Sequence, residues 1–138
     1  MILVVDASVA AMWFLPEPLS EEAALLLAPR YDLVAPDLIL LEVGGVLLRA
    51  LRRDEIGLAE ATEAFAARLP AAVRTFPAVD DGEAAFDVAR RHGGTIYDAV
   101  YVALARRLNA PVITNDAGLA SVARKAKARA RMIADGAP

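Results

Sequence analysis

The sequence predicts a single three-layer α/β/α domain in which a central parallel sheet is flanked by helices. Short runs of aliphatic and β-branched residues, typical of buried parallel strands, alternate along the chain with longer segments of helical periodicity. The segments between these elements are short, as in sheets whose strands are connected by helices. Because 138 residues suffice for one hydrophobic core but not for two, we expect residues 1–138 to form one domain.

The first half of the chain contains two strand signals. Each is a short aliphatic run, and the first ends at an aspartate. Ser20 is followed by two glutamates, a pattern typical of a helix N-terminus. The longest predicted helix has apolar residues on every face of its first three turns, so we expect it to be largely buried. These signals predict strands at 2–5 and 33–35 and helices directly after Asp6, at 20–28 and from Pro36 to about Arg53.

Alanine-rich helical patterns fill the second half of the chain. Gly93 and Gly94 end one helix, and Thr95 is placed to cap the next. The apolar run that ends at Thr114 predicts a buried strand. The predicted elements are helices at 58–69, 82–92, 96–108 and 119–128 and strands at 73–77 and 111–114.

Composition restricts the classes of protein. Hydrophobic residues make up 57% of the chain, which favours apolar surface left over for a partner. The absence of cysteine excludes disulfides and thiolate chemistry and suits a reducing cytoplasm. Charged residues interrupt the longest apolar stretch, and Asp6 lies inside the first one, so we expect neither a membrane span nor a signal sequence. We expect a soluble, cytoplasmic protein.

Charge is distributed unevenly. The net charge of −3 argues against strong indiscriminate binding to nucleic acid, which depends on neutralising phosphates. Residues 1–48 contain seven acidic side chains and one basic, whereas residues 49–138 contain eleven acidic and fourteen basic. Such basic clusters are more often solvated helix faces than ligand sites. The densest cluster comprises Arg124, Lys125, Lys127, Arg129 and Arg131.

Four acidic residues stand in or at the end of apolar stretches: Asp6, Glu42, Asp98 and Asp116. Burying an unpaired carboxylate costs several kcal/mol or forces protonation, and a bound cation would remove that cost. With no cysteine and one histidine in the chain, oxygen ligands would hold the cation, which favours Mg²⁺ or Mn²⁺. The sequence therefore predicts a shared metal site.

Each carboxylate also has a purely structural interpretation. Asp6 could cap the first helix, Asp116 could cap the last, and Asp98 follows Thr95 at the spacing of a capping box. Glu42 could extend its carboxylate to the surface, although no side chain one turn away on its own helix can pair with it. One shared metal site would explain why all four acidic residues stand in apolar surroundings.

Four stretches in this order resemble the PIN-domain ribonucleases, specifically the VapC toxins of bacterial toxin–antitoxin pairs. They match the family's first strand and aspartate, the helix with its glutamate, its most recognisable helix, and its last strand and aspartate. Two departures concern Gly45, where the family often has asparagine, and Met12, where it often has lysine. The matching stretches are Val4–Val9, Pro36–Val43, Tyr97–Ala105 and Val112–Asp116.

The resemblance implies a Mg²⁺- or Mn²⁺-dependent endoribonuclease in which metal-activated water hydrolyses RNA and leaves 5′-phosphate and 3′-hydroxyl ends. It also implies a homodimer and a small antitoxin whose segment lies across the catalytic groove. We expect basic residues of the later helices, such as Arg124 and Lys125, to form an RNA-binding rim. The implied metal ligands are Asp6, Asp98, Asp116 and Glu42, which could instead orient the water, and the implied supporting residues are Ser8 and Thr114.

Two other functions remain open at this stage. Asp6 could be the nucleophile of a phosphohydrolase or phospho-receiver, but such sites usually need a lysine near the phosphate. The chain has only Lys125 and Lys127, both far along the sequence. The second alternative is a non-catalytic interaction module whose carboxylates are helix caps.

Overall fold

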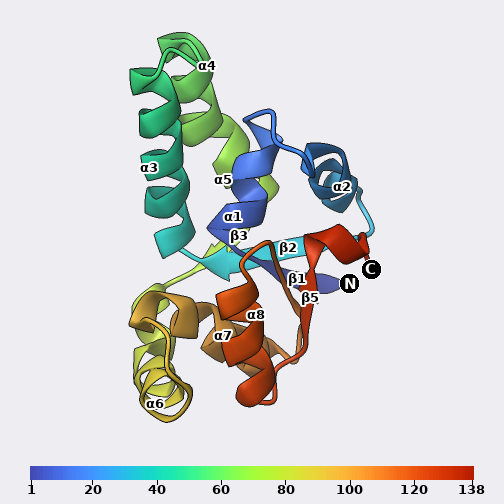
Figure 1. Ribbon diagram of the computed structural model, residues 1–138, viewed down its shortest axis with the longest axis vertical. Helices are drawn as coiled ribbons and strands as arrows, with labels where there is room; N and C mark the ends of the chain where they lie inside the picture. The colour runs from blue at the N-terminus through green and yellow to red at the C-terminus, as the bar shows by residue number, and fades with distance from the viewer.

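The computed structural model describes residues 1–138 and shows a five-stranded parallel sheet between two groups of helices (Figure 1). The strand order β3-β2-β1-β4-β5 makes β1 the centre, with the much later β4 directly beside it. All pairings are parallel, as predicted from the alternation of strands and helices. The strands are β1 (Ile2–Val5), β2 (Asp32–Pro36), β3 (Arg74–Phe76), β4 (Val112–Thr114) and β5 (Ala130–Met132).

The helices form the two outer layers. Helices α1 to α5 lie above the sheet in Figure 1 and helices α6 to α8 lie below it. No helix is both long and apolar enough to span a bilayer. The α-helices are α1 (Ala7–Ala10), α2 (Ser20–Ala24), α3 (Leu38–Arg52), α4 (Leu58–Glu63), α5 (Leu69–Ala72), α6 (Gly82–His92), α7 (Ile96–Leu108) and α8 (Ala117–Lys125). Shorter helical turns are η1 (Ala11–Trp13), η2 (Leu25–Leu27), the π-helical η3 (Ala64–Arg68), η4 (Ala78–Asp81) and η5 (Ile133–Asp135).

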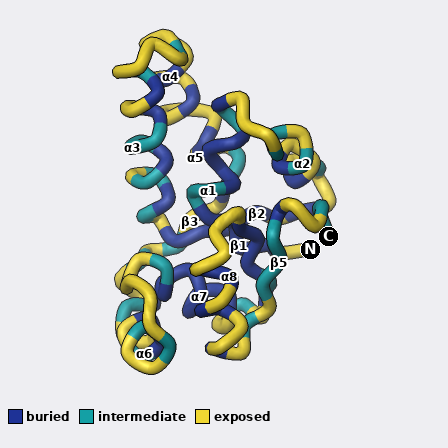
Figure 2. The backbone as a smooth tube through the Cα atoms, viewed as in Figure 1, coloured by how far each residue is buried: buried dark blue, intermediate teal, exposed yellow.

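The core is centred on β1 and α7. Residues Leu3–Val5 are fully buried, and α7, which contacts β1, β2 and β4, is buried continuously from Ala99 to Ala105 (Figure 2). Helix α7 lies across the sheet while α6 and α8 cover its outer sides. An apolar run of seven residues is the pattern of a helix enclosed in this way.

Most predicted elements are confirmed. The bounds of α6 and α7 agree with prediction, and Thr95 caps α7 by accepting a hydrogen bond from the Asp98 backbone N–H at 3.1 Å. The fifth strand, β5, was missed because Arg129 and Arg131 flank its first residue, Ala130, and the segment reads as a basic surface run. Edge strands are half exposed and tolerate such charges.

Two predictions about the long helix α3 were wrong. Pro36 closes β2, and the helix begins at Leu38. The helix is not largely buried: Leu41 is 76% exposed and Leu48 is 49% exposed. Helix α3 extends away from the sheet and packs beside α4, which covers only one of its sides (Figure 1).

Candidate active site

Residues from opposite ends of the chain meet at the carboxyl edge of the sheet. In the parallel pairing of β1 with β4, Val5 lies beside Ile113. The next residue of each strand is therefore also adjacent, so Asp6 and Thr114 are neighbours although 108 residues separate them. The carboxyl edge of a parallel sheet is the usual place for a ligand site in this class of fold.

Asp6 is almost fully buried and held by three donors. Thr114 Oγ1 donates to Oδ2 at 2.7 Å, while Ser8 Oγ and the Val9 backbone N–H donate to Oδ1 at 2.7 and 3.3 Å. The bond from Val9 makes Asp6 the N-cap of α1, so the structural interpretation is correct. Burial nevertheless raises the pKa of Asp6, and the charge of Asp116 adds to this effect.

Thr114 and Ser8 connect the two strand ends. The buried Thr114 Oγ1 accepts a hydrogen bond from the Asp116 backbone N–H at 2.9 Å, and Ser8 Oγ accepts one from the Asn115 N–H at 2.9 Å. Each hydroxyl thus donates to Asp6 and accepts from the segment after β4. This network orients the Asp6 carboxylate before any ligand binds.

The remaining two aspartates lie at the starts of helices that begin at this edge, Asp98 in the first turn of α7 and Asp116 as the N-cap of α8. Asp116 caps α8 by accepting from the Gly118 and Leu119 N–H groups at 2.8 and 3.2 Å. The Asp98 carboxylate accepts no hydrogen bond from another group of the protein. Burial raises the pKa of Asp98, and the nearby charge of Asp116 raises it further.

Glu42, on the second turn of α3, has a partner that no local pattern reveals. Tyr101 Oη donates to Glu42 Oε1 at 2.7 Å from α7, 59 residues away, and this tyrosine is buried. Burial raises the pKa of Glu42, Tyr101 opposes that shift, and the charges of Asp6 and Asp98 reinforce it. The same surroundings raise the pKa of the Tyr101 hydroxyl, which therefore stays a donor.

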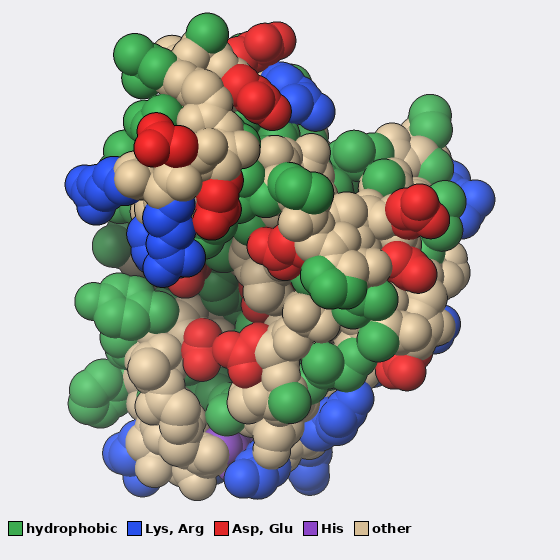
Figure 3. Space-filling view, turned by 45° about the horizontal axis from the view of Figure 1, so that its top comes forward, with side chains coloured by type: hydrophobic (Ala, Val, Ile, Leu, Met, Phe, Trp, Pro, Cys, Tyr) green, Lys and Arg blue, Asp and Glu red, His purple; other side chains and the backbone are tan.

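The charges of the four carboxylates act on one another in pairs. Asp116 acts on Asp6 and Asp98, which in turn act on Glu42. Acidic side chains surround the central cleft of the face in Figure 3. The two carboxylates at strand ends and the two on helices thus lie within reach of one another's charge, although no three of them form a compact cluster. The shared metal site stays a prediction.

The donor set fits a hard divalent cation. No three acidic or histidine side chains lie close enough to form a ready-made cage. Mg²⁺ does not need one, because it usually binds one or two carboxylates and completes its shell with water and phosphate oxygens. Four oxygen donors whose charges no basic side chain neutralises suit Mg²⁺ or Mn²⁺ better than zinc or copper.

A groove beside the carboxylates contains a basic residue that sequence reasoning missed. It has a volume of about 580 Å³ and is lined by Ser8, Glu42, Asn115 and Arg49, among others. Arg49 lies seven positions, about two helical turns, after Glu42 on α3, and that spacing was the available signal. It forms no salt bridge, so its guanidinium is free for an anion.

The two departures from the family pattern differ in their structural effect. Gly45 also lines this groove, and a Cβ there would lie 3.9 Å from Arg49 Nη1, an ordinary contact distance. The position therefore has room for a side chain. Met12 is 4% exposed and packs in the core, so a phosphate contact from this position is excluded.

The basic cluster of residues 124–131 does not surround the carboxylates, so the position expected for an RNA-binding rim was wrong; that these side chains bind RNA stays a prediction. Arg124 and Lys125 lie in the last turn of α8, whereas Asp116 caps its first turn. Lys127 precedes β5 at the opposite, amino edge of the sheet. No lysine therefore lies beside Asp6, which removes support from the phosphohydrolase alternative.

Comparison with known proteins identifies the family. The model of the PIN domain family matches residues 3–125, which include all four carboxylates. The chain belongs to the PIN-domain family. It is 36% identical over 127 residues to ribonuclease VapC3 of Pyrobaculum aerophilum, covering 87% of this chain and 93% of that protein. It is 34% identical over 115 residues to ribonuclease VapC9 of Mycobacterium tuberculosis, covering 83% and 86%.

Solved structures confirm the PIN fold. A protein from Pyrobaculum aerophilum aligns with 98% of this chain and 94% of its own at a TM-score of 0.70 and 19% identity. VapC20 of Mycobacterium tuberculosis, a toxin that cleaves the sarcin–ricin loop, aligns with 86% of this chain and 92% of its own. Its TM-score is 0.65 at 23% identity. At these identities the likeness concerns the fold alone.

Proposed function

We propose that this PIN-domain protein is a metal-dependent endoribonuclease of the VapC type, the toxin of a toxin–antitoxin pair, and that it acts in the cytoplasm. The observation on which the proposal depends is that Asp6, Glu42, Asp98 and Asp116 lie within reach of one another's charge at the carboxyl edge of the sheet, where burial and mutual repulsion raise the pKa of three of them. VapC relatives that match most of the chain support the same activity.

In this proposal, Asp6, Asp98 and Asp116 hold Mg²⁺ or Mn²⁺. When bound, the cation supplies Lewis-acid chemistry: it lowers the pKa of a coordinated water and stabilises charge on the phosphate. Ser8 and Thr114 fix the direction of the Asp6 carboxylate through the two hydrogen bonds of 2.7 Å. Together with the Val9 N–H they occupy three of the four acceptor sites of this carboxylate and leave one for a cation.

Glu42 positions the attacking water in this proposal. Tyr101 holds Oε1, so Oε2 is free to accept a hydrogen bond from water and to take up its proton. A raised pKa makes this carboxylate a better base than an exposed glutamate. The Arg49 guanidinium, in the same groove, is placed to bind a neighbouring phosphate of the RNA.

The test is cleavage of a labelled RNA with Mg²⁺, with Mn²⁺ and with EDTA. We expect cleavage with either cation, none with EDTA, and losses of about 10²-fold or more for Asp6→Ala and Asp98→Ala. Glu60→Ala, which removes an exposed carboxylate on α4, is the matched control and should cleave like the parent. Activity that survives EDTA would exclude the proposal.

The ends of the products provide a second test. Because water is the proposed nucleophile, the fragments should have 5′-phosphate and 3′-hydroxyl ends. Ligation of the fragments to an acceptor and their mobility after phosphatase treatment distinguish these ends. Products with 2′,3′-cyclic phosphates would mean that the RNA's own 2′-hydroxyl is the nucleophile and would rule out this mechanism.

We also propose two protein partners, a second copy of the chain and a cognate antitoxin. Exposed apolar residues on α3 and α4 support this, because Leu41, Leu48 and Leu58 line a groove of about 380 Å³. Such a groove suits an apolar antitoxin segment that continues towards the acidic cleft. Sedimentation at micromolar concentration tests the homodimer, and a species of 14.6 kDa would reject it.

A further inference from the structure

A row of basic side chains lies at the amino edge of the sheet, opposite the candidate active site. It lines three adjoining hollows of about 460, 170 and 280 Å³. Arg129 is shared by the first and second hollows, and Arg106 and Lys127 are shared by the second and third. Lys and Arg side chains gather at the lower end of the molecule, around its single histidine, in Figure 3. This basic belt comprises Arg106, Lys125, Lys127, Arg129 and Arg131.

No salt bridge neutralises the belt, although Asp135 binds Arg131 through its backbone carbonyl. None of the belt's five residues takes part in a salt bridge. From Ala117 to Ala134 the chain contains five basic residues and no acidic one. The acid that lines the third hollow, Asp87, is already bound by Arg90 and Arg91 at 2.7 and 3.0 Å. The positive charge of the basic belt is therefore available to an external anion.

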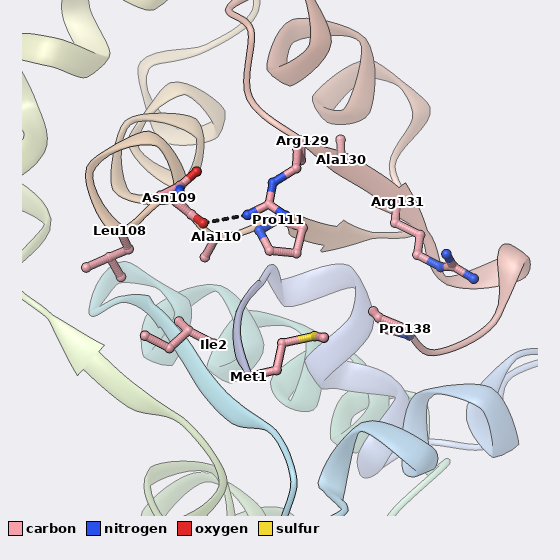
Figure 4. Close-up of a pocket in the computed structure, with 10 residues that line it drawn as sticks. All are labelled: Met1, Ile2, Leu108, Asn109, Ala110, Pro111, Arg129, Ala130, Arg131 and Pro138. Atoms are coloured by element: carbon pink, nitrogen blue, oxygen red, sulfur yellow. Dashed lines mark hydrogen bonds between the residues drawn. The ribbon is translucent and has the colours of Figure 1, made fainter.

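Backbone carbonyls hold the two arginines of the first hollow in place. Arg129 donates to the carbonyl of Asn109 at 2.5 Å, the bond drawn in Figure 4. Arg131 donates to the carbonyls of Gly136 and Asp135 at 2.8 and 2.7 Å. A neutral carbonyl fixes a guanidinium without cancelling its charge, and each arginine retains further N–H donors. The pair is ordered before a ligand arrives.

Lys127 stands at a position where the backbone favours glycine. Its φ of 61° is left-handed, and it follows α8 in a Schellman motif, with the Lys127 N–H bonded to the Arg124 carbonyl and the Ala128 N–H to the Ala123 carbonyl. Attraction to helix C-termini explains Arg106 and Lys125. It does not explain a lysine at the position after α8, where a glycine would be less strained.

We propose that the basic belt binds the phosphate backbone of double-helical RNA and so holds the folded part of the substrate. This rests on the proposed ribonuclease function. Exposed, unpaired cations in a row suit phosphates. No Phe, Tyr or Trp lines the three hollows, and without aromatic side chains the belt lacks the stacking surfaces of single-strand sites.

The position of the belt determines which RNA can use it. From Pro111 to Asp116 the chain crosses the sheet from the amino to the carboxyl edge, a distance of roughly 16 Å at the rise of a β-strand. A short single-stranded RNA bound in the groove beside Glu42 would stay at the carboxyl edge and would not reach the belt. A folded RNA whose stem lies along α7 and α8 spans both edges, so the belt favours structured substrates.

Binding to an RNA duplex of about 16 base pairs in EDTA, measured by fluorescence anisotropy, tests the belt without catalysis. Lys125→Gln combined with Lys127→Gly removes two charges whose side chains make no hydrogen bond, and the glycine suits the left-handed backbone. We expect affinity to fall about 10-fold at 0.1 M salt and the slope of log K against log salt to become shallower by about 1 to 2. Arg52→Gln with Arg53→Gln, an exposed pair at the end of α3, is the charge-matched control and should change neither.

Three results would overturn the proposal. The first is a parent that does not bind the duplex, and the second is an Arg52/Arg53 control that loses as much RNA affinity as the belt variant. The third is a belt variant whose dimerisation changes while its RNA affinity does not. Cleavage of RNA provides a second, independent test of the belt. The belt variant should cleave a hairpin RNA about 10-fold less efficiently than the parent, and a short single strand equally well. A parent that binds the duplex but cleaves neither RNA would contradict the proposed function and leave the belt standing.

Discussion

At the scale of single residues, Asp98 differs from the other three carboxylates. Asp6, Glu42 and Asp116 each accept hydrogen bonds from side chains or backbone N–H groups. The carboxylate of Asp98 has no such donor, and burial together with Asp116 raises its pKa. In the absence of a cation, its ionised form therefore destabilises the native protein.

The sign of this effect predicts a pH dependence. The native protein binds the Asp98 proton more tightly than the unfolded chain does, so stability falls as pH rises from the ordinary pKa of 3.8 through the raised native value. In EDTA, Asp98→Asn should raise the melting temperature at pH 7 by about 3 °C and leave it nearly unchanged near pH 4. Thermal unfolding of the parent and of Asp98→Asn at several pH values measures the change in melting temperature at pH 7 and near pH 4. A gain of equal size at pH 4 and pH 7 would contradict this explanation.

At the scale of elements, α7 determines the geometry of the site. It contributes Asp98 in its first turn and Tyr101 in its second, and its last turn is tied to η4. There Arg107 donates to both carboxylate oxygens of the buried Asp81, at 2.7 and 2.9 Å. This pair fastens the end of α7 away from the cleft.

Arg107→Leu should therefore destabilise the protein. The substitution leaves Asp81, which is 4% exposed, buried without a partner. The loss should be about 2 kcal/mol, less than for a fully buried pair because the Arg107 side chain is 45% exposed. Urea unfolding measures it. Arg106→Leu, a neighbouring exposed arginine without a salt bridge, is the control and should stay within about 0.5 kcal/mol of the parent.

Elements with strong local signals were predicted from the sequence, and elements without them were not. Helices α6 and α7 have a glycine or a capping threonine at their ends, and their bounds were correct. The fifth strand has three residues, Ala130–Met132, and too little apolar periodicity to be recognised. The exposure of α3 depends on how α4 packs beside it, which no pattern within α3 records.

At the scale of the whole molecule, the four carboxylates and the unpaired Arg49 lie at the carboxyl edge of the sheet, whereas the basic belt lies at the amino edge. A cation at the carboxyl edge would connect β1, α3, α7 and α8, because each of these elements contains or directly adjoins one of the four carboxylates. Its binding free energy would add to the stability of the entire fold.

Mn²⁺ should therefore raise the melting temperature. At about 100 times its dissociation constant, a ligand of the native state adds about 2.7 kcal/mol, which corresponds to roughly 8 °C for a chain of this size. Thermal unfolding with Mn²⁺ and then with excess EDTA measures the shift and its reversal. Asp98→Ala should reduce the shift and Glu60→Ala should not. No shift in the parent would favour the non-catalytic module.

The alternation of strands and helices and the four acidic positions could be predicted from the amino-acid sequence, because burial periodicity and isolated carboxylates are local properties of a chain. The hydrogen bond from Tyr101 to Glu42, the place of Arg49 in the groove and the position of the basic cluster at the opposite edge became visible in the folded chain. These depend on the order of strands in the sheet, which places β4 beside β1 across more than a hundred residues. Local patterns specify which face of an element is buried, whereas strand order specifies what that face meets.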